Sequence, residues 1–281
     1  RDILLTTISI AEEEGWNVLH AIVDCLWIEN PNIKTREEKV SKALQLSKRV
    51  SEEIGIPLEF EDIYDFIGFL PSRMHGAGSL TKYWAHGQNG FKLRGIESRQ
   101  HSTCQWIRDI QNDALELLLQ NVESKKKFDS ITVQNRILKM FHEQLDRLYS
   151  GEIAPKDLVV VKRVTKKIED FRVSTTTKDA IIRAKKIGHD ILPGRKVRYV
   201  VAKSVEGDSK SRVILCEELG GKVNFIVDYQ YYEGLAIRAI WAILGPFGWT
   251  DEEIVDGGKK LTLFDFFSTF NSKSTMDDST C

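Results

Sequence analysis

The chain has 281 residues and a formal net charge of −1, with 42% hydrophobic and 29% charged residues. These values are ordinary for one or two globular domains, and they exclude a strongly basic nucleic-acid-binding chain. Any surface that binds DNA must therefore come from local basic patches.

Cysteine use and hydropathy exclude two further classes of protein. The most apolar late stretch, 235–249, is interrupted by Arg238, Gly245 and Pro246, and it is too short to span a bilayer. The cysteines lie far apart and form no C-x-x-C pair, which argues against a zinc site and for a reducing compartment. They are Cys25, Cys104, Cys216 and Cys281.

The first hundred residues alternate helical and strand patterns, which predicts an α+β arrangement. The second helix has the clearest boundaries, because Thr35 can cap its start and Gly55 and Pro57 close it. The expected elements are a helix over 3–14, a hairpin over 16–29, a helix over 35–54, a strand over 58–70, a flexible turn over 75–79, and strands over 80–85 and 91–97 joined by the loop 86–90.

Beyond residue 100 the pattern becomes mostly helical with a small sheet, so we place a domain boundary near residue 100. The last residues, 268–281, are polar and are expected to be mobile. The expected elements are helices over 103–122, 130–149, 179–188 and 228–244, a charged connector over 125–127, and strands over 158–161, 197–202 and 213–217.

The hairpin near the start of the chain carries one carboxylate, Asp24, between two apolar runs. Burial of a carboxylate costs free energy unless the group is hydrogen-bonded, paired or bound to a metal ion. These residues alone leave both a structural role and a metal-binding role open.

Six segments, in the same order, resemble the C-terminal part of family B DNA polymerases, most closely the archaeal kind. Together they cover nearly the whole chain. They are 20–25, 56–64, 82–99 with Lys82-Tyr83 and Leu93-Arg94-Gly95-Ile96-Glu97, 158–163, 193–201, and 228–248.

The resemblance implies a metal site at Asp24. The family's Tyr-Gly-Asp-Thr-Asp-Ser motif binds metal through its second Asp, and Asp24 stands in that slot for Mg²⁺, while the first Asp is Ile22. His20 replaces the tyrosine and Cys25 replaces the serine. Two alternatives follow: a working half-site that needs a partner chain, or an inactivated palm. Glu59 and Glu61, sharing a strand face, are either near the metals or simply exposed.

The resemblance also implies partners. The family's exonuclease domain, its first palm segment with another metal-binding Asp, and its fingers helix have no counterpart in this sequence. Nucleotidyl transfer is therefore expected only together with an N-terminal polymerase half, on primer-template DNA in the cytoplasm, with no membrane association.

The expected DNA contacts are basic and aromatic residues at strand ends and turns, where backbone contacts position a duplex. The alternative is an ordinary solvated charged surface. The candidates are Lys82, Tyr83, Arg94, Gly95, Arg99, Lys162, Arg163, Arg195, Lys196, Arg198 and Tyr199.

The segment 260–267 resembles the family's sliding-clamp-binding peptide. Leu263, Phe266 and Phe267 match its apolar positions, while Lys260 replaces the usual Gln. These side chains form one face of a helical turn that fits a hydrophobic groove; packing back on the thumb is the alternative.

We therefore expect an α+β fold: a partial polymerase palm, with an antiparallel sheet and helices, over 1–100, a mainly helical thumb over 101–256 and a clamp-binding tail over 257–281. The expected function is the C-terminal part of a family B DNA polymerase, as a split subunit or a fragment. The alternative is an inactive, polymerase-derived protein that binds DNA and tethers it to a sliding clamp.

Overall fold

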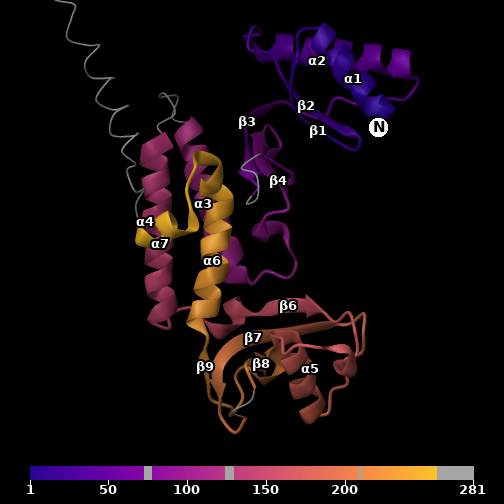
Figure 1. The fold of residues 1–281 in the computed structure, drawn as a ribbon. Helices are drawn as coiled ribbons and strands as arrows, with labels where there is room; N and C mark the ends of the chain where they lie inside the picture. Colours follow the sequence, from indigo (N-terminus) through magenta and orange to yellow (C-terminus); the bar gives the residue numbers. More distant parts are fainter. Residues whose placement is uncertain (73–77, 124–129, 209–210, 258–281) are drawn as a thin grey trace, which may run out of the picture. The chain divides into compact units, whose positions relative to one another are not determined.

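The computed structural model describes residues 1–72, 78–123, 130–208 and 211–257 (Figure 1). The chain forms two compact units, one over Arg1–Ile96 and the other from Glu97 onward. The connector at 125–127, most of the turn at 75–79 and the tail at 268–281 lie outside the described residues. Within the described part of the chain, every helix is too short or too polar to cross a bilayer.

The first unit is built around the hairpin of β1 (Asn17–Ile22) and β2 (Cys25–Glu29). One face of the hairpin packs on α1 (Asp2–Glu13) and α2 (Arg36–Ile54). This core is apolar, because the strands and both helices each turn one apolar face inward. Its buried members are Ile10, Ala11, Trp16, Ile33, Leu46 and Val50, with Val18, Leu26 and Ile28 packed against them.

The other face of the hairpin packs on an antiparallel sheet of β3 (Tyr64–Pro71), β4 (Gly78–Gly87) and β5 (Gly90–Arg94). His20 and Trp27, opposite each other in the hairpin, point to this side. The His20 ring lies 4.9 Å from Phe69, and the Trp27 ring lies 5.3 Å from Tyr83. The hairpin is thus covered on both faces within this unit.

Helix α2 confirms the boundaries expected from its caps. The Thr35 side chain accepts a hydrogen bond from the Glu38 amide at 3.2 Å, and Gly55 ends the helix in the left-handed conformation, with φ 75°. Only glycine adopts that conformation without strain, so the position of Gly55 in the sequence predicts where the helix ends.

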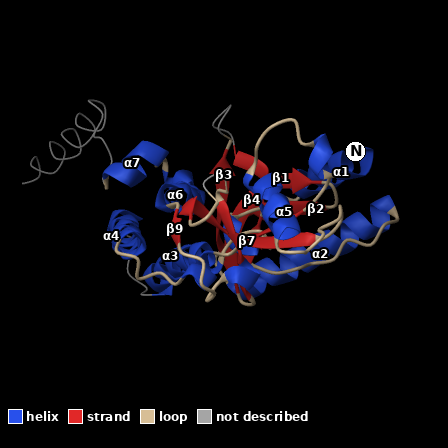
Figure 2. Cartoon of the chain, turned by 90° about the horizontal axis from the view of Figure 1, so that it is seen from below, coloured by secondary structure: helices blue, strands red, loops and turns tan. Residues whose placement is uncertain are grey.

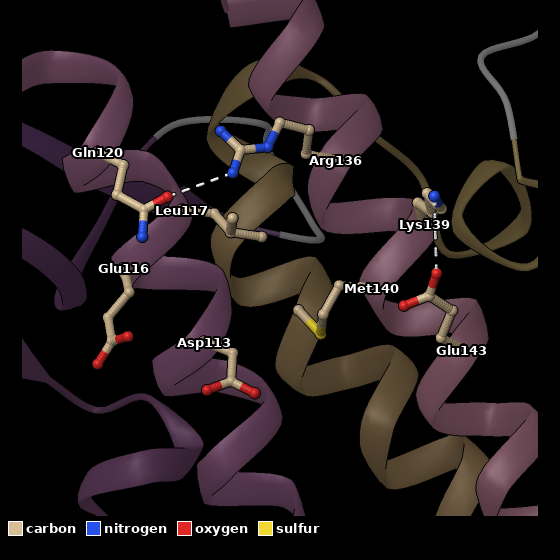
Figure 3. Close-up of a pocket in the computed structure, with 8 residues that line it drawn as sticks. All are labelled: Asp113, Glu116, Leu117, Gln120, Arg136, Lys139, Met140 and Glu143. Atoms are coloured by element: carbon tan, nitrogen blue, oxygen red, sulfur yellow. Dashed lines mark hydrogen bonds and ion pairs between the residues drawn. The ribbon is translucent and has the colours of Figure 1, made fainter. Parts of the chain in front are cut away.

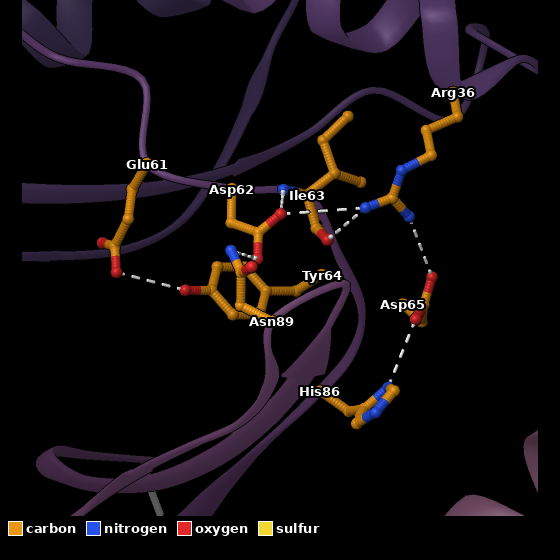
Figure 4. Close-up of polar contacts among 8 residues, drawn as sticks. All are labelled: Arg36, Glu61, Asp62, Ile63, Tyr64, Asp65, His86 and Asn89. Atoms are coloured by element: carbon orange, nitrogen blue, oxygen red, sulfur yellow. Dashed lines mark hydrogen bonds and ion pairs between the residues drawn. The ribbon is translucent and has the colours of Figure 1, made fainter.

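The expected strand over 58–70 is wrong at its start, because β3 begins at Tyr64. Side chains satisfy the backbone of the preceding segment: Ser47 donates to the Leu58 carbonyl at 2.5 Å, and Ser51 accepts from the Leu58 amide at 2.8 Å. Arg36 donates to the Ile63 carbonyl at 3.1 Å (Figure 4). Glu59 and Glu61 therefore lie on irregular chain and do not share a strand face.

Four helices of the second unit pack together: α3 (Gln105–Glu123), α4 (Ser130–Tyr149), α6 (Tyr229–Leu244) and α7 (Asp251–Asp256) (Figure 2). Buried amides cross-link them. Gln111 of α3 donates to the Ala239 carbonyl at 2.8 Å, and Trp249 donates to Gln134 of α4 at 2.5 Å. Because these polar groups are satisfied, their burial fixes the packing without a large penalty.

The rest of the second unit is a small antiparallel sheet of β6 (Val160–Arg163), β7 (Lys196–Val205) and β8 (Val213–Leu215), with β9 (Phe225–Val227) also paired to β7. Helix α5 (Thr176–Lys186) packs on β7 and β8 (Figure 1). The Tyr232 hydroxyl of α6 donates to the Leu158 carbonyl at 2.7 Å and accepts from the Val201 amide at 2.9 Å. This one side chain ties the helices to the sheet.

The pattern-based boundaries differ from the structure where short elements occur. The strand expected over 158–161 is displaced by a 3₁₀ turn at Pro155–Leu158, and α5 begins at Thr176, capped by Thr175. Strand β9 and helix α7 were not predicted. The capping box of α7, between Thr250 and Glu253, was the signal that its six residues offered.

A buried ion pair joins α5 to the turn after β8. Arg183 is 7% exposed, and it donates to both carboxylate oxygens of Glu218, at 2.6 and 2.8 Å. Asp208 lies 3.6 Å from the same guanidinium. Removal of the cation alone leaves the Glu218 carboxylate, whose side chain is 12% exposed, without its counter-charge, whereas Asp208 keeps Lys186 at 2.6 Å.

We therefore expect Arg183→Ala to lower the free energy of unfolding by about 3–5 kcal/mol. Arg147→Ala is the matched control, because its pair with Glu152 is 3.4 Å long and half-exposed, and it should cost no more than about 1 kcal/mol. Urea denaturation followed by circular dichroism measures both. Equal losses for the two variants would contradict the assignment.

Candidate functional site

Asp24 lies in the two-residue turn between β1 and β2. The preceding residue, Val23, has φ 52° and is 84% exposed, so the turn projects into solvent. Asp24 is also exposed, and it makes no hydrogen bond or ion pair within the described residues. The carboxylate expected to need a partner because of burial is therefore not buried.

Two of the residues that replace the family's polar neighbours, His20 and Cys25, pack on the sheet side of the hairpin, and Ile22 is half-buried. Ile22 and Cys25 are opposite each other in the hairpin register, and His20 is 7% exposed against Phe69 and Tyr83. Burial raises the pKa of the Cys25 thiol above its usual value. At pH 7 the thiol is therefore protonated, which fits a packing role and not a nucleophile.

The other carboxylates near the hairpin lie against basic side chains or a histidine of the same unit (Figure 4). Arg36 lies 3.4 Å from Asp65 and 3.7 Å from Asp62. His86 lies 3.3 Å from Asp65, and Glu61 pairs with Lys92 at 2.5 Å. Within the described ranges, no group of three or more His, Cys, Asp or Glu side chains is placed to hold a metal ion.

Asp24 consequently fits a metal site to which this chain contributes a single carboxylate ligand. Mg²⁺ takes hard oxygen ligands and is usually held by one or two carboxylates together with waters and substrate phosphates. A single exposed carboxylate in a projecting turn matches the contribution of one such ligand. The remaining ligands must come from outside the described residues.

The hairpin of β4 and β5 confirms the expected strand pairing, with the shorter connection Gln88–Asn89. Lys82 and Arg94 are exposed, and neither makes an ion pair within the described residues. Tyr83 is only 3% exposed and packs between Trp27 and Phe69. The expected surface contact by the Tyr83 ring is therefore not supported.

Gly95 follows β5 in the left-handed conformation, with φ 66°. A Cβ atom at this position would lie 2.5 Å from the Thr81 carbonyl oxygen and 2.9 Å from Cγ of Lys82. The glycine thus lets two chain segments approach closely beside Lys82 and Arg94. Arg99 is exposed on a 3₁₀ turn, Glu97–Arg99, of the second unit.

The β6–β7 register sorts the basic residues of the second unit onto two faces. Arg163 is opposite Lys196, and Arg198 is opposite Val161 on the same exposed face. Lys162 is opposite the buried Val197, so it belongs to the other face. The exposed group Arg163, Lys196 and Arg198 makes no ion pair within the described residues, and we call it the basic face.

Two more candidates flank this strand pair. Arg195 is exposed immediately before β7, and its carbonyl accepts from the Val164 amide at 2.8 Å. Tyr199 is fully buried, and its hydroxyl lies 3.0 Å from the Thr176 hydroxyl. The Tyr199 ring is therefore a core group, and its expected surface role is not supported.

A groove of about 420 Å³ lies between α3 and α4 and was not anticipated from the sequence (Figure 3). Arg136 donates to Gln120 at 3.2 Å across it. Burial, followed by the charges of Glu116 and Asp109, raises the pKa of Asp113. Its residues come from two helices and form no motif, so no sequence signal marks it. They are Asp113, Glu116, Leu117, Gln120, Arg136, Lys139, Met140 and Glu143.

The predicted clamp-binding residues lie outside the described part of the chain. They are Lys260, Leu263, Phe266 and Phe267.

Comparison with known proteins gives consistent matches. The family model described as DNA polymerase family B matches residues 23–246. A DNA polymerase of Archaeoglobus fulgidus is 23% identical over 281 residues, covering 95% of this chain and 33% of that protein. A DNA polymerase of Thermococcus kodakarensis is 25% identical over 256 residues, covering 90% of this chain and 14% of that protein.

A solved structure shares the fold. The family B DNA polymerase from the hyperthermophilic archaeon Pyrobaculum calidifontis superposes with a TM-score of 0.56 at 21% identity, covering 89% of this chain and 29% of that one. The chain thus spans a third or less of the length of these relatives.

The geometry of Gly95 can be tested against a second left-handed glycine. Gly90→Ala should lower the free energy of unfolding by only about 1–2 kcal/mol, the penalty for a left-handed alanine, because nothing lies within 4 Å of its Cβ position. Gly95→Ala should cost more, since the Thr81 carbonyl must also move. Urea denaturation of the two variants measures the difference, and similar losses would contradict the close approach.

Proposed function

Because this chain belongs to DNA polymerase family B, we propose that it is the second half of the palm and the thumb of such a polymerase. On this proposal, residues 1–100 are palm, 101–256 are thumb and 257–281 are a clamp-binding tail. It acts in the cytoplasm with an N-terminal polymerase half, as a split subunit or as part of a longer chain. The observation that carries the proposal is the exposed, unpaired Asp24 at the tip of the hairpin.

Asp24 would supply one oxygen ligand to a Mg²⁺ ion, and the partner half would supply the others. When bound, Mg²⁺ stabilises the charge on the attacking and leaving oxygens during in-line displacement at phosphorus. The projecting turn keeps the Asp24 carboxylate in solvent, where it can meet groups from a second chain. His20 and Trp27 hold that turn by packing the hairpin onto the sheet behind it.

The primer-template duplex would be held by unpaired cations. Backbone contacts from Lys and Arg position a duplex without reading its sequence. The basic face supports this role because its three cations share one surface of the β6–β7 pair and have no internal counter-charge. Lys82, Arg94, Arg99 and Arg195 are exposed and join the set, with Gly95 holding the chain beside Arg94. Lys162 lies on the opposite face of the β6–β7 pair and is left out of the set.

A second function is favoured by the inward-facing replacements at the hairpin. Ile22 brings no carboxylate, and His20 is packed among aromatic rings. These features support a polymerase-derived protein without catalysis that binds duplex DNA and tethers it to a sliding clamp. Lys260, Leu263, Phe266 and Phe267 would form the clamp contact.

Reconstitution separates the two functions. Mixed with the cognate N-terminal half, the chain should incorporate nucleotides. Asp24→Asn should reduce the rate of incorporation by about a hundredfold or more, because loss of a residue that only supports a metal ligand already costs up to about a hundredfold in activity. Glu29→Gln, an exposed carboxylate at the far end of the hairpin, is the matched control and should leave the rate unchanged.

The opposite outcome identifies the second function. If no incorporation occurs in any mixture while duplex DNA and the sliding clamp are still bound, the chain is a binding and tethering protein. If Asp24→Asn retains full incorporation, the proposed role of Asp24 is wrong.

Duplex binding tests the basic face. The triple variant Arg163→Gln, Lys196→Gln, Arg198→Gln should bind duplex DNA more weakly and should reduce the slope of log K against log salt by about 2–3, since each phosphate contact contributes roughly 0.9. Lys162→Gln is the matched control on the opposite face, with little expected change. Fluorescence anisotropy over a salt series measures both slopes, and an equal reduction by Lys162→Gln would contradict the assignment.

A further inference from the structure

Lys92 of β5 sits in an aromatic cage. Its ammonium nitrogen lies 5.2 Å from the centroid of the Trp27 ring and 5.8 Å from that of Tyr64. The two rings lie against each other, with centroids 4.7 Å apart. An ammonium held over the faces of tryptophan and tyrosine is attracted by the ring quadrupoles, and this is how proteins recognise bound cations.

The same ammonium binds Glu61 through both carboxylate oxygens, each at 2.5 Å. The Tyr64 hydroxyl also donates to Glu61, at 3.2 Å (Figure 4). Burial lowers the pKa of Lys92, but the hydrogen bond and the charge of Glu61 outweigh it, and the pKa lies above its usual value. The cation in the cage is therefore permanent at neutral pH.

The pair lies beside the strand that follows Asp24. Trp27, whose ring Lys92 contacts, packs with Cys25 and Tyr64 in one cluster, and Cys25 directly follows Asp24 in the chain. Glu61 is paired with Lys92, whereas Asp24 makes no ion pair within the described residues.

The three side chains that meet here come from different segments. Trp27 belongs to β2, Glu61 to the irregular segment before β3, and Lys92 to β5. A cation supplied by the chain therefore gathers the segments around the hairpin, which is the task that a bound metal ion performs in other sites.

We propose that Lys92 is a built-in cation that holds Glu61 in place of a divalent metal ion, so that Glu61 takes no part in metal binding and the hairpin offers Asp24 alone. A metal ion at Glu61 would have to compete with the ammonium, which contacts both carboxylate oxygens. This inference deepens the proposed function and rests on it for the metal-binding role of Asp24.

The test uses Mn²⁺ as the probe, with its free concentration followed by electron paramagnetic resonance during titration of the chain assembled with its N-terminal half. Glu61→Gln should leave Mn²⁺ binding as it is in the unchanged chain. Lys92→Met should raise the affinity for Mn²⁺ roughly tenfold or more, because it frees the Glu61 carboxylate and because residues next to metal ligands change metal affinity on this scale. The double variant Lys92→Met, Glu61→Gln should lose that gain.

Lys92→Arg is the matched control, because it keeps a positive charge at Glu61 and should give no gain. If Lys92→Met does not fold, as judged by circular dichroism, Lys92→Gln replaces it. The inference is overturned if Glu61→Gln weakens Mn²⁺ binding in the otherwise unchanged chain, or if the folded, uncharged Lys92 variant gains no affinity.

Asp24→Asn tests the proposed function separately. Loss of the Mn²⁺ bound by the unchanged chain in this variant supports the role of Asp24, and unaltered binding counts against that role. Neither result changes what the Glu61 and Lys92 variants report, so failure of the inference and failure of the proposed function are distinguishable.

Discussion

The hairpin of β1 and β2 has an apolar side chain on each of its faces, and both faces must be covered for two strands to persist in water. Helices α1 and α2 cover one face, and the sheet of β3, β4 and β5 covers the other through His20 and Trp27. With both faces packed, the turn at Val23 and Asp24 is the part left in solvent. The exposure of the candidate metal ligand is thus a consequence of how the strands beside it are buried.

In the second unit, buried hydrogen bonds and an ion pair hold the segments together. Gln111, Tyr232 and Arg183 are each buried, and each has its hydrogen bonds satisfied by a group far away in the chain. A buried polar group without a partner is costly, so each of these contacts allows one arrangement of the segments it joins. The sheet that carries the basic face is fixed to the helices in this way.

Charge is distributed differently over the two candidate regions. Around the hairpin, Glu61 is paired with Lys92, and Asp62 and Asp65 are paired with Arg36. On β6 and β7, the exposed cations make no ion pair with any residue that the structure describes. Free cations favour an anionic backbone as ligand, whereas internally paired carboxylates leave little for a metal ion beyond Asp24.

The sequence by itself determined the α+β class, the capped helices, the two hairpins and the family, because these depend on local caps, on periodicity and on ordered motifs. It also identified Asp24 and the basic residues. It did not determine where β3 begins, that Asp24 is exposed, that Tyr83 and Tyr199 are buried, or that Lys162 faces away from Arg163. Those properties depend on which distant segment supplies a hydrogen bond or covers a face, and only the tertiary structure decides that. Lys92 is the clearest case: the sequence shows an ordinary strand lysine, and only the structure places it against Trp27, Tyr64 and Glu61.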